Sequence, residues 1–238
     1  MRLVAARPLR AVGCSMPKII AFSGKSNSGK TTLICKLAEI LRAQGKSVGV
    51  IKHDPKDKAE FDTKGKKERK DSYKFSLVAQ NVAVISPKKS VIFGFCTQDD
   101  EGRENVAQGG SAQDKGVRSE NERSESVQGG AQNDSVCGAQ RDLSAYELRE
   151  FERALEFFGA CDYVFIEGLR TLPYRRIIVA RGELDSAYLP YGVAIAMDRE
   201  LRNRIDVARL GDLEVLDLNN PQEILDFIDK ECVCKGSK

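Results

Sequence analysis

GKSNSGKT, residues 24–31, is the stretch that decides the fold, because it fills every fixed position of the pattern G-x-x-x-x-G-K-T. The short apolar run at 19–23 precedes it and predicts a buried strand. Apolar residues at helical spacing follow it and predict a helix that stops near Gly45. A strand, this glycine loop and a helix form the context of a P-loop, or Walker A motif. The sequence therefore predicts that a nucleoside triphosphate binds here with magnesium.

The fixed residues of this loop each have a physical task in phosphate binding. Glycines let successive backbone N–H groups curl around phosphate oxygens. The N-terminus of the following helix adds a favourable dipole. We expect Lys30 to reach the β- and γ-phosphates, and the Thr31 hydroxyl to ligate Mg²⁺.

Strand and helix patterns alternate along the rest of the chain. This alternation predicts an α/β fold, a mostly parallel sheet flanked by helices as in P-loop NTPases. Further strands are expected at 47–51, 81–86, 90–95, 162–166, 177–180, 193–197 and 213–218. Further helices are expected at 73–80, at 144–158 after a capping-box pattern, and at 221–228.

Two segments have a composition that does not suit a packed core. Residues 98–142 are rich in Gly, Ser, Gln, Asn and Glu and lack aromatic residues, so we expect a disordered, low-complexity insertion. The α/β pattern resumes after it without a new start, which predicts a single P-loop domain over 16–238. The basic residues 1–15 are expected to be a disordered extension ahead of Met16.

The bulk composition excludes several classes of function. A net charge of +3 and a pI of about 8.4 are too mild to indicate nucleic-acid binding. No apolar run has membrane-spanning length. The seven cysteines show no paired CxxC spacing, so neither a disulfide framework nor a zinc site is indicated. We expect a cytoplasmic protein that binds neither membrane nor nucleic acid.

Three acidic positions are candidates for the metal side of the nucleotide. Glu167 ends the apolar run 163–166, where it is placed to touch Mg²⁺ through water or to polarise the attacking water. His53 and Asp54 follow the second strand and are candidates for the same crevice, since ligands in open α/β sheets lie at the carboxyl ends of strands. The alternative for His53 is that it is a plain polar residue at the end of a strand. Asp71 is a further candidate, and its alternative role is to cap a helix.

The sequence gives no clear signal for recognition of the base, and it leaves two interpretations of Lys25 open. The nearest match to the guanine signature Asn-Lys-x-Asp is at 203–206, several residues beyond the strand at 193–197, and we interpret it as coincidence. A lysine at the second P-loop position also occurs in dimeric partition-type ATPases, where it crosses to the partner's nucleotide. Ser26-Asn27-Ser28 replaces the glycines of those loops, so Lys25 is alternatively a plain basic loop residue.

Four motifs occur together in a recognisable order: FSGKSNSGKTTL at 22–33, GVIKHD at 49–54, KDSY at 70–73 and IEGLR at 166–170. With them the chain resembles the molybdopterin-guanine dinucleotide biosynthesis protein B family (MobB). The likeness covers residues 18–87 and, more loosely, 162–228. The chain departs from the family after His53, where Asp54-Pro55-Lys56-Asp57 replaces a second histidine and aspartate.

The resemblance implies a P-loop GTP-binding protein that forms homodimers and hydrolyses GTP slowly with Mg²⁺. Its role would be to support the guanylyltransferase that attaches GMP to molybdopterin in molybdenum-cofactor biosynthesis. The implied catalytic residues are Lys30 and Glu167, and the implied metal residues are Thr31, Asp54 and Glu167. The implied nucleotide contacts are Gly24, Lys25, Asn27, Ser28, Gly29, Lys30, Thr31, Thr32, His53 and Asp71.

Two other functions remain open from the residues alone. A P-loop kinase for a small metabolite would need an arginine-rich lid. The arginines near the candidate site are Arg170, Arg175, Arg176 and Arg181. A nucleotide-gated adaptor that does not hydrolyse its ligand would carry the same motifs.

Overall fold

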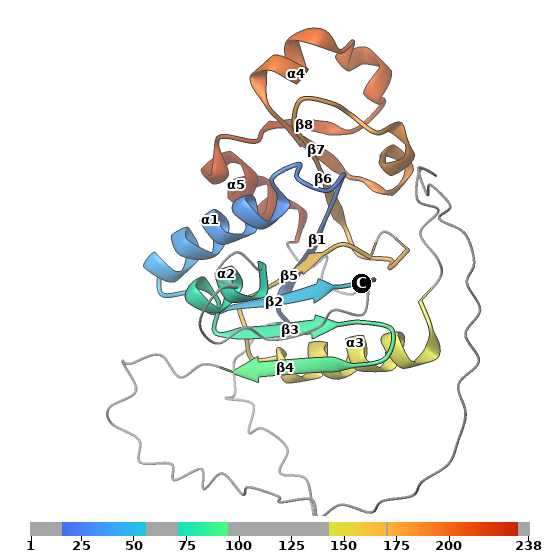
Figure 1. Cartoon of the computed structure of the whole chain (residues 1–238). Helices are drawn as coiled ribbons and strands as arrows, with labels where there is room; N and C mark the ends of the chain where they lie inside the picture. Colours follow the sequence, from blue (N-terminus) through green and yellow to red (C-terminus); the bar gives the residue numbers. More distant parts are fainter. Residues whose placement is uncertain (1–15, 56–70, 95–142, 170, 233–238) are drawn as a thin grey trace, which may run out of the picture. The chain divides into compact units, whose positions relative to one another are not determined.

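The computed structural model describes residues 16–55, 71–94, 143–169 and 171–232 (Figure 1). The predicted extension at 1–15 and the predicted insertion at 98–142 lie outside these residues. Within the described part of the chain, no helix combines the length and the apolar character that crossing a membrane requires.

One sheet of eight strands organises the described residues, in the order β4-β3-β2-β5-β1-β6-β7-β8. Neighbouring strands run parallel except β3 and β4, which are antiparallel. The predicted α/β class with a mostly parallel sheet is therefore confirmed. The strands are β1 (Lys18–Ser23), β2 (Val48–His53), β3 (Asn81–Ile85), β4 (Ser90–Gly94), β5 (Tyr163–Glu167), β6 (Arg176–Ala180), β7 (Ala194–Met197) and β8 (Glu214–Asp217).

The predicted helices are present, and three shorter helical segments were not predicted. The predicted ones are α1 (Lys30–Ala43), α2 (Asp71–Val78), α3 (Ala145–Phe157) and α5 (Pro221–Glu231). The others are α4 (Arg199–Arg204) and two 3₁₀ segments, Ser186–Tyr191 and Val207–Leu210. These three are too short to show a helical period, but each begins after an aspartate whose side chain accepts a backbone hydrogen bond.

The helices divide between the two faces of the sheet (Figure 1). Residues of α1, α2 and α5 pack with Ile20 and Phe22 of β1 in one apolar cluster. Residues of α3 pack with Ala21 of β1 in a second cluster on the opposite face, because side chains alternate along a strand. A third cluster joins Leu201 of α4 to Ile178 of β6.

The parallel strands bring separate sequence motifs to one edge of the sheet. β1, β2, β5 and β6 all end there, since their register pairs equivalent positions along each strand. The edge therefore carries the loop after Ser23 and residues at or next to the ends of the three neighbouring strands: Lys52 within the end of β2, Glu167 at the end of β5, and Arg181 directly after β6. Ligands in open parallel sheets bind at this kind of edge.

Phe158, at the C-terminal end of α3, packs closely against Gly49 of β2. A Cβ atom added at Gly49 would lie 2.6 Å from Cδ2 of Phe158, which is fully buried. We expect Gly49→Ala to lower the free energy of unfolding by about 1–3 kcal/mol in urea denaturation. In a Phe158→Leu background the same change should cost less, because the smaller side chain leaves room. An equal cost in both backgrounds would argue against the contact.

Candidate functional site

The glycine loop between β1 and α1 has a conformation that few other residues allow. Gly24 has a φ of 146°, and a Cβ atom there would lie 2.2 Å from the Val179 carbonyl oxygen of β6. Gly29 has a φ of 97°, and Asn27 adopts the left-handed region at a φ of 65°. The motif's two glycines are therefore required by the close approach of β6 and by the backbone turn.

The start of α1 is suited to hold an anion. Its N-cap is Gly29, which offers no side-chain cap, and the first turn carries no acidic residue. The N–H groups of that turn are the ones a phosphate would bind. Lys30 folds back over the loop, with Nζ donating to the carbonyl oxygens of Gly24 at 2.9 Å and Lys25 at 2.6 Å. Burial lowers the pKa of Lys30 from its ordinary value.

Four polar side chains from four elements meet beside this loop. Thr31 of α1 donates its hydroxyl to Oε1 of Glu167 at 3.1 Å. Lys52 of β2 lies 3.6 Å from Oε2 of Glu167 and makes an ion pair with Asp71 at the start of α2. The predicted residues Thr31, Asp71 and Glu167 are thus brought together. Lys52 was missed as a site residue, although it stands in the Ile-Lys-His motif.

The carboxyl group of Glu167 lies in a buried environment that disfavours its negative charge. It is 7% exposed, and burial raises the pKa of its carboxyl group, while Lys52 acts in the opposite direction. Its Oε2 atom is buried and makes no hydrogen bond with a described residue. A carboxylate oxygen with spare acceptor capacity beside a threonine hydroxyl fits the oxygen ligands that Mg²⁺ prefers.

The structure does not bring His53 to this group. His53 Nε2 lies 2.9 Å from Oε1 of Glu147 on α3, and both side chains are buried. Consecutive strand residues face opposite sides, so Lys52 points to the Asp71 side and His53 to the α3 side. The nucleotide contact that the sequence suggested for His53 stays a prediction, and the structure places the ring beside Glu147. Asp54 follows β2, where its N–H donates to the Ile85 carbonyl, and its role at the metal stays a prediction.

The other predicted positions lie in or near the loop. Lys25 makes an ion pair with Glu183 of the same chain at 2.8 Å. Ser28 has a buried hydroxyl without a hydrogen-bond partner among the described residues. Thr32 is exposed on the first turn of α1. The 203–206 match to the guanine signature falls at the end of α4 and before a 3₁₀ segment, in agreement with its interpretation as coincidence.

Arg176 supports the site from behind, and sequence reasoning did not identify this role. It is 1% exposed, and Nη1 donates to the Ser23 hydroxyl at 2.6 Å and the Gly168 carbonyl at 2.9 Å. Nη2 donates to the carbonyl of Leu169 at 2.6 Å. Burial lowers the pKa of Arg176 to about 10. The guanidinium therefore ties the turn after Glu167 to the end of β1.

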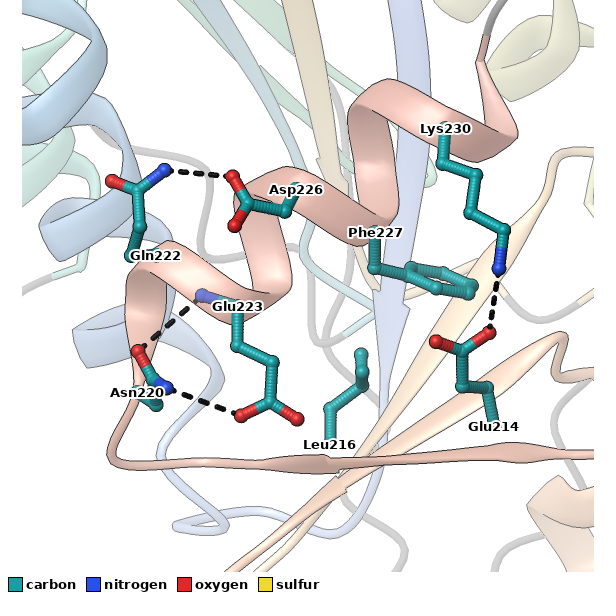
Figure 2. A pocket seen from close by; sticks show the side chains of 8 residues that line it. All are labelled: Glu214, Leu216, Asn220, Gln222, Glu223, Asp226, Phe227 and Lys230. Atoms are coloured by element: carbon teal, nitrogen blue, oxygen red, sulfur yellow. Dashed lines mark hydrogen bonds and ion pairs between the residues drawn. The ribbon is translucent and has the colours of Figure 1, made fainter.

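A separate cavity of about 360 Å³ lies between β8 and α5 (Figure 2). Its polar side chains already bond to one another: Lys230 pairs with Glu214, and Gln222 donates to Asp226. The cavity shares no residue with the P-loop group. Its lining residues are Glu214, Leu216, Asn220, Gln222, Glu223, Asp226, Phe227 and Lys230.

Replacing Arg176 should destabilise the fold strongly. Arg176→Met keeps a long side chain but leaves buried carbonyl oxygens without a donor, so we expect a loss of about 2–4 kcal/mol in urea denaturation. The neighbouring Arg175, whose ion pair with Glu231 is half exposed, serves as the control. Arg175→Met should cost less than about 1 kcal/mol. Equal losses for the two variants would contradict the assigned role.

The raised pKa of Glu167 makes stability depend on pH. Its ionised form is less stable in the folded protein than in the unfolded chain, so the penalty is present above the folded pKa and vanishes below the unfolded one. Without Mg²⁺, Glu167→Gln should therefore raise the free energy of unfolding by on the order of 1 kcal/mol at neutral pH. This gain should shrink as pH falls toward about 4.

Urea denaturation across this pH range tests the prediction. Glu156→Gln, on the exposed side of α3, is the control and should show no comparable gain at any pH. The opposite trend would contradict the prediction. If the free energy of unfolding of Glu167→Gln rose relative to that of the unaltered protein as pH falls, the folded protein would favour the ionised carboxylate.

Comparison with known proteins supports the resemblance seen in the motifs. The family described as "Molybdopterin guanine dinucleotide synthesis protein B" (MobB) matches residues 19–114. No curated protein matches the sequence.

Several solved structures are similar in fold at low identity. The crystal structure of Bacillus subtilis MobB is 18% identical and covers 92% of this chain and 99% of its own, with a TM-score of 0.43. Another molybdopterin-guanine biosynthesis protein B is 20% identical and covers 90% of this chain and 98% of its own, with a TM-score of 0.41. The hydrogenase maturation factor HypB from Archaeoglobus fulgidus is 15% identical and covers 90% of this chain and 89% of its own, with a TM-score of 0.45.

The family match includes three of the four motifs on which the resemblance rests, at 22–33, 49–54 and 70–73. It also includes three members of the polar group beside the loop: Thr31, Lys52 and Asp71. Residues 19–114 of the chain therefore match the MobB family, which confirms the resemblance that the motifs indicate.

Proposed function

We propose that this chain is a GTP-binding accessory protein with a slow, Mg²⁺-dependent GTPase activity. It would support the guanylylation of molybdopterin in molybdenum-cofactor biosynthesis. The observation that carries this proposal is the contact of Thr31 with Glu167, flanked by Lys52 and Asp71, beside a P-loop whose sequence matches the MobB family.

Phosphate binding follows from the loop and from Lys30. Lys30 Nζ donates to two neutral carbonyl groups of the loop. A phosphate oxygen is a stronger acceptor, because it is charged, so a bound triphosphate would draw the ammonium group away from these carbonyls. The N–H groups of the first turn of α1 would complete the cradle.

Magnesium would be held on the side of Glu167. Thr31 would give its hydroxyl oxygen as a ligand, and Glu167 would hold a water of the ion or touch the ion itself. When bound, the ion neutralises charge between the β- and γ-phosphates. Burial raises the pKa of the Glu167 carboxyl group, and the ammonium group of Lys52 opposes this effect by favouring the charged carboxylate.

Slow hydrolysis is expected from the same contacts. Glu167 accepts from Thr31 and faces Lys52, so its carboxylate is better placed to order water than to remove a proton from it. In P-loop GTPases, a positioned water attacks the terminal phosphate only slowly when no arginine finger is present there. The chain would then act chiefly through its nucleotide-bound state.

The guanine preference and the partner follow from the family name. A protein of molybdopterin guanine dinucleotide synthesis would bind the nucleotide that supplies the guanylyl group. We propose molybdopterin guanylyltransferase as the protein partner, a homodimer as the working form and the cytoplasm as the location.

Calorimetric titration with GTP and ATP in the presence of Mg²⁺ tests the proposal. We expect GTP to bind at least about tenfold more tightly than ATP, and Lys30→Ala to bind roughly 10- to 100-fold more weakly than the unaltered protein. Lys36→Ala, an exposed lysine on the same helix, should bind like the unaltered protein. A preference for ATP, or unfolding of the Lys30→Ala variant, would contradict the proposal.

Single-turnover hydrolysis separates a GTPase from a binding protein. The unaltered protein should convert bound GTP to GDP measurably faster than the Lys30→Ala variant at equal protein concentration. A rate no faster than that of the variant would leave GTP binding without catalysis.

A further inference from the structure

Arg181 lies against the phosphate loop from the side opposite to Glu167. It directly follows β6, and its guanidinium covers Gly29: a Cβ atom there would lie 3.5 Å from both Nε and Nη2 of Arg181. The side chain is exposed, and it makes no ion pair with any residue that the structure describes. Among the described residues, this cation therefore has no carboxylate partner, and it lies next to a loop suited to bind an anion.

The turn that carries Arg181 is fastened by α4. Arg181 and Glu183 form an antiparallel bridge around Gly182, which has a φ of 71°. The Gly182 N–H donates to Oδ2 of Asp198, the N-cap of α4, at 2.9 Å, and Arg204 of α4 donates to the Gly182 carbonyl. The backbone of this turn is therefore held at both its donor and its acceptor.

A third contact fixes the same turn to the loop itself. Glu183 makes its ion pair with Lys25, the second residue of the P-loop. The two residues on either side of Gly182 thus reach the two ends of the loop, Lys25 and Gly29. The turn at residues 181–183 therefore lies alongside the P-loop and contacts it at both ends.

The strand order shows which part of a nucleotide Arg181 would meet. β1 lies between β5 and β6 in the sheet. Glu167 ends β5, and its group marks the side of the metal and the terminal phosphate. The remainder of the ligand then extends across the loop, over the ends of β6 and β7. This places Arg181 at the α-phosphate and the ribose.

We propose that Arg181 binds the α-phosphate and ribose end of the guanine nucleotide, which is present in both GTP and GDP. This rests on the proposed function, because it assumes a guanine nucleotide in the loop. A guanidinium offers planar, paired N–H donors to phosphate oxygens, which a lysine does not reproduce. The fastened turn keeps that fork in place before the ligand arrives.

Calorimetric titration with GTP and with GDP, both with Mg²⁺, tests this role. Arg181→Ala should weaken the binding of both nucleotides by about tenfold and by the same factor. Arg181→Met keeps the length of the side chain without its charge and should lose as much. Arg181→Lys should fall between these variants and the unaltered protein. Arg202→Ala, an exposed arginine of α4, is the control and should leave both affinities unchanged.

Several results would overturn the assignment, and thermal melts of each variant establish that it is folded. Full affinity of Arg181→Met would mean that the side chain acts only by packing on Gly29. A loss confined to GTP would place Arg181 at the γ-phosphate instead. Normal binding by Arg181→Ala would overturn this inference alone. Failure of the unaltered protein to bind either nucleotide would overturn the proposed function as well.

Discussion

The carboxylate of Glu167 is buried where β5, α1, β2 and α2 meet, and the arrangement of the site depends on how its charge is accommodated. Thr31 donates to one oxygen, and Lys52 stands near the other while also pairing with Asp71. Burial of a charged group is unfavourable unless it is paired and hydrogen-bonded. One oxygen nevertheless lacks a hydrogen bond among the described residues, and such incomplete pairing is typical of positions where a ligand completes the group.

At the end of β2, the two faces of the sheet carry different polar contacts. On one face, Lys52 joins the group beside the P-loop. On the other, His53 pairs with Glu147, which also forms the capping box that starts α3. Arg176 links the end of β1 to the turn after β5, because it donates both to Ser23 before the loop and to the Gly168 carbonyl after Glu167. Movement of that turn would therefore break hydrogen bonds to Arg176 as well as contacts in the polar group beside the P-loop.

Local sequence patterns predicted the helices and strands, whereas they could not predict contacts between segments that are distant in the sequence. The P-loop, the strands and the longer helices have fixed residues or a period, so the sequence was enough to find them. Arg176 and Arg181 owe their positions to the pairing of β1 with β6, which no pattern near either residue reveals. His53 shows a different limit: adjacency to Lys52 in a motif suggested a shared site, although alternation along a strand separates the two side chains.

The pairing of His53 with Glu147 has a practical consequence, because this is the only histidine in the chain. Its ring would give a single set of imidazole resonances in a magnetic resonance spectrum, free of overlap from other histidines. The ring lies one residue from Lys52, on the reverse side of the sheet from the P-loop group. The protein thus contains a single natural histidine close to the P-loop edge of its sheet, whose signal can be followed without any added label.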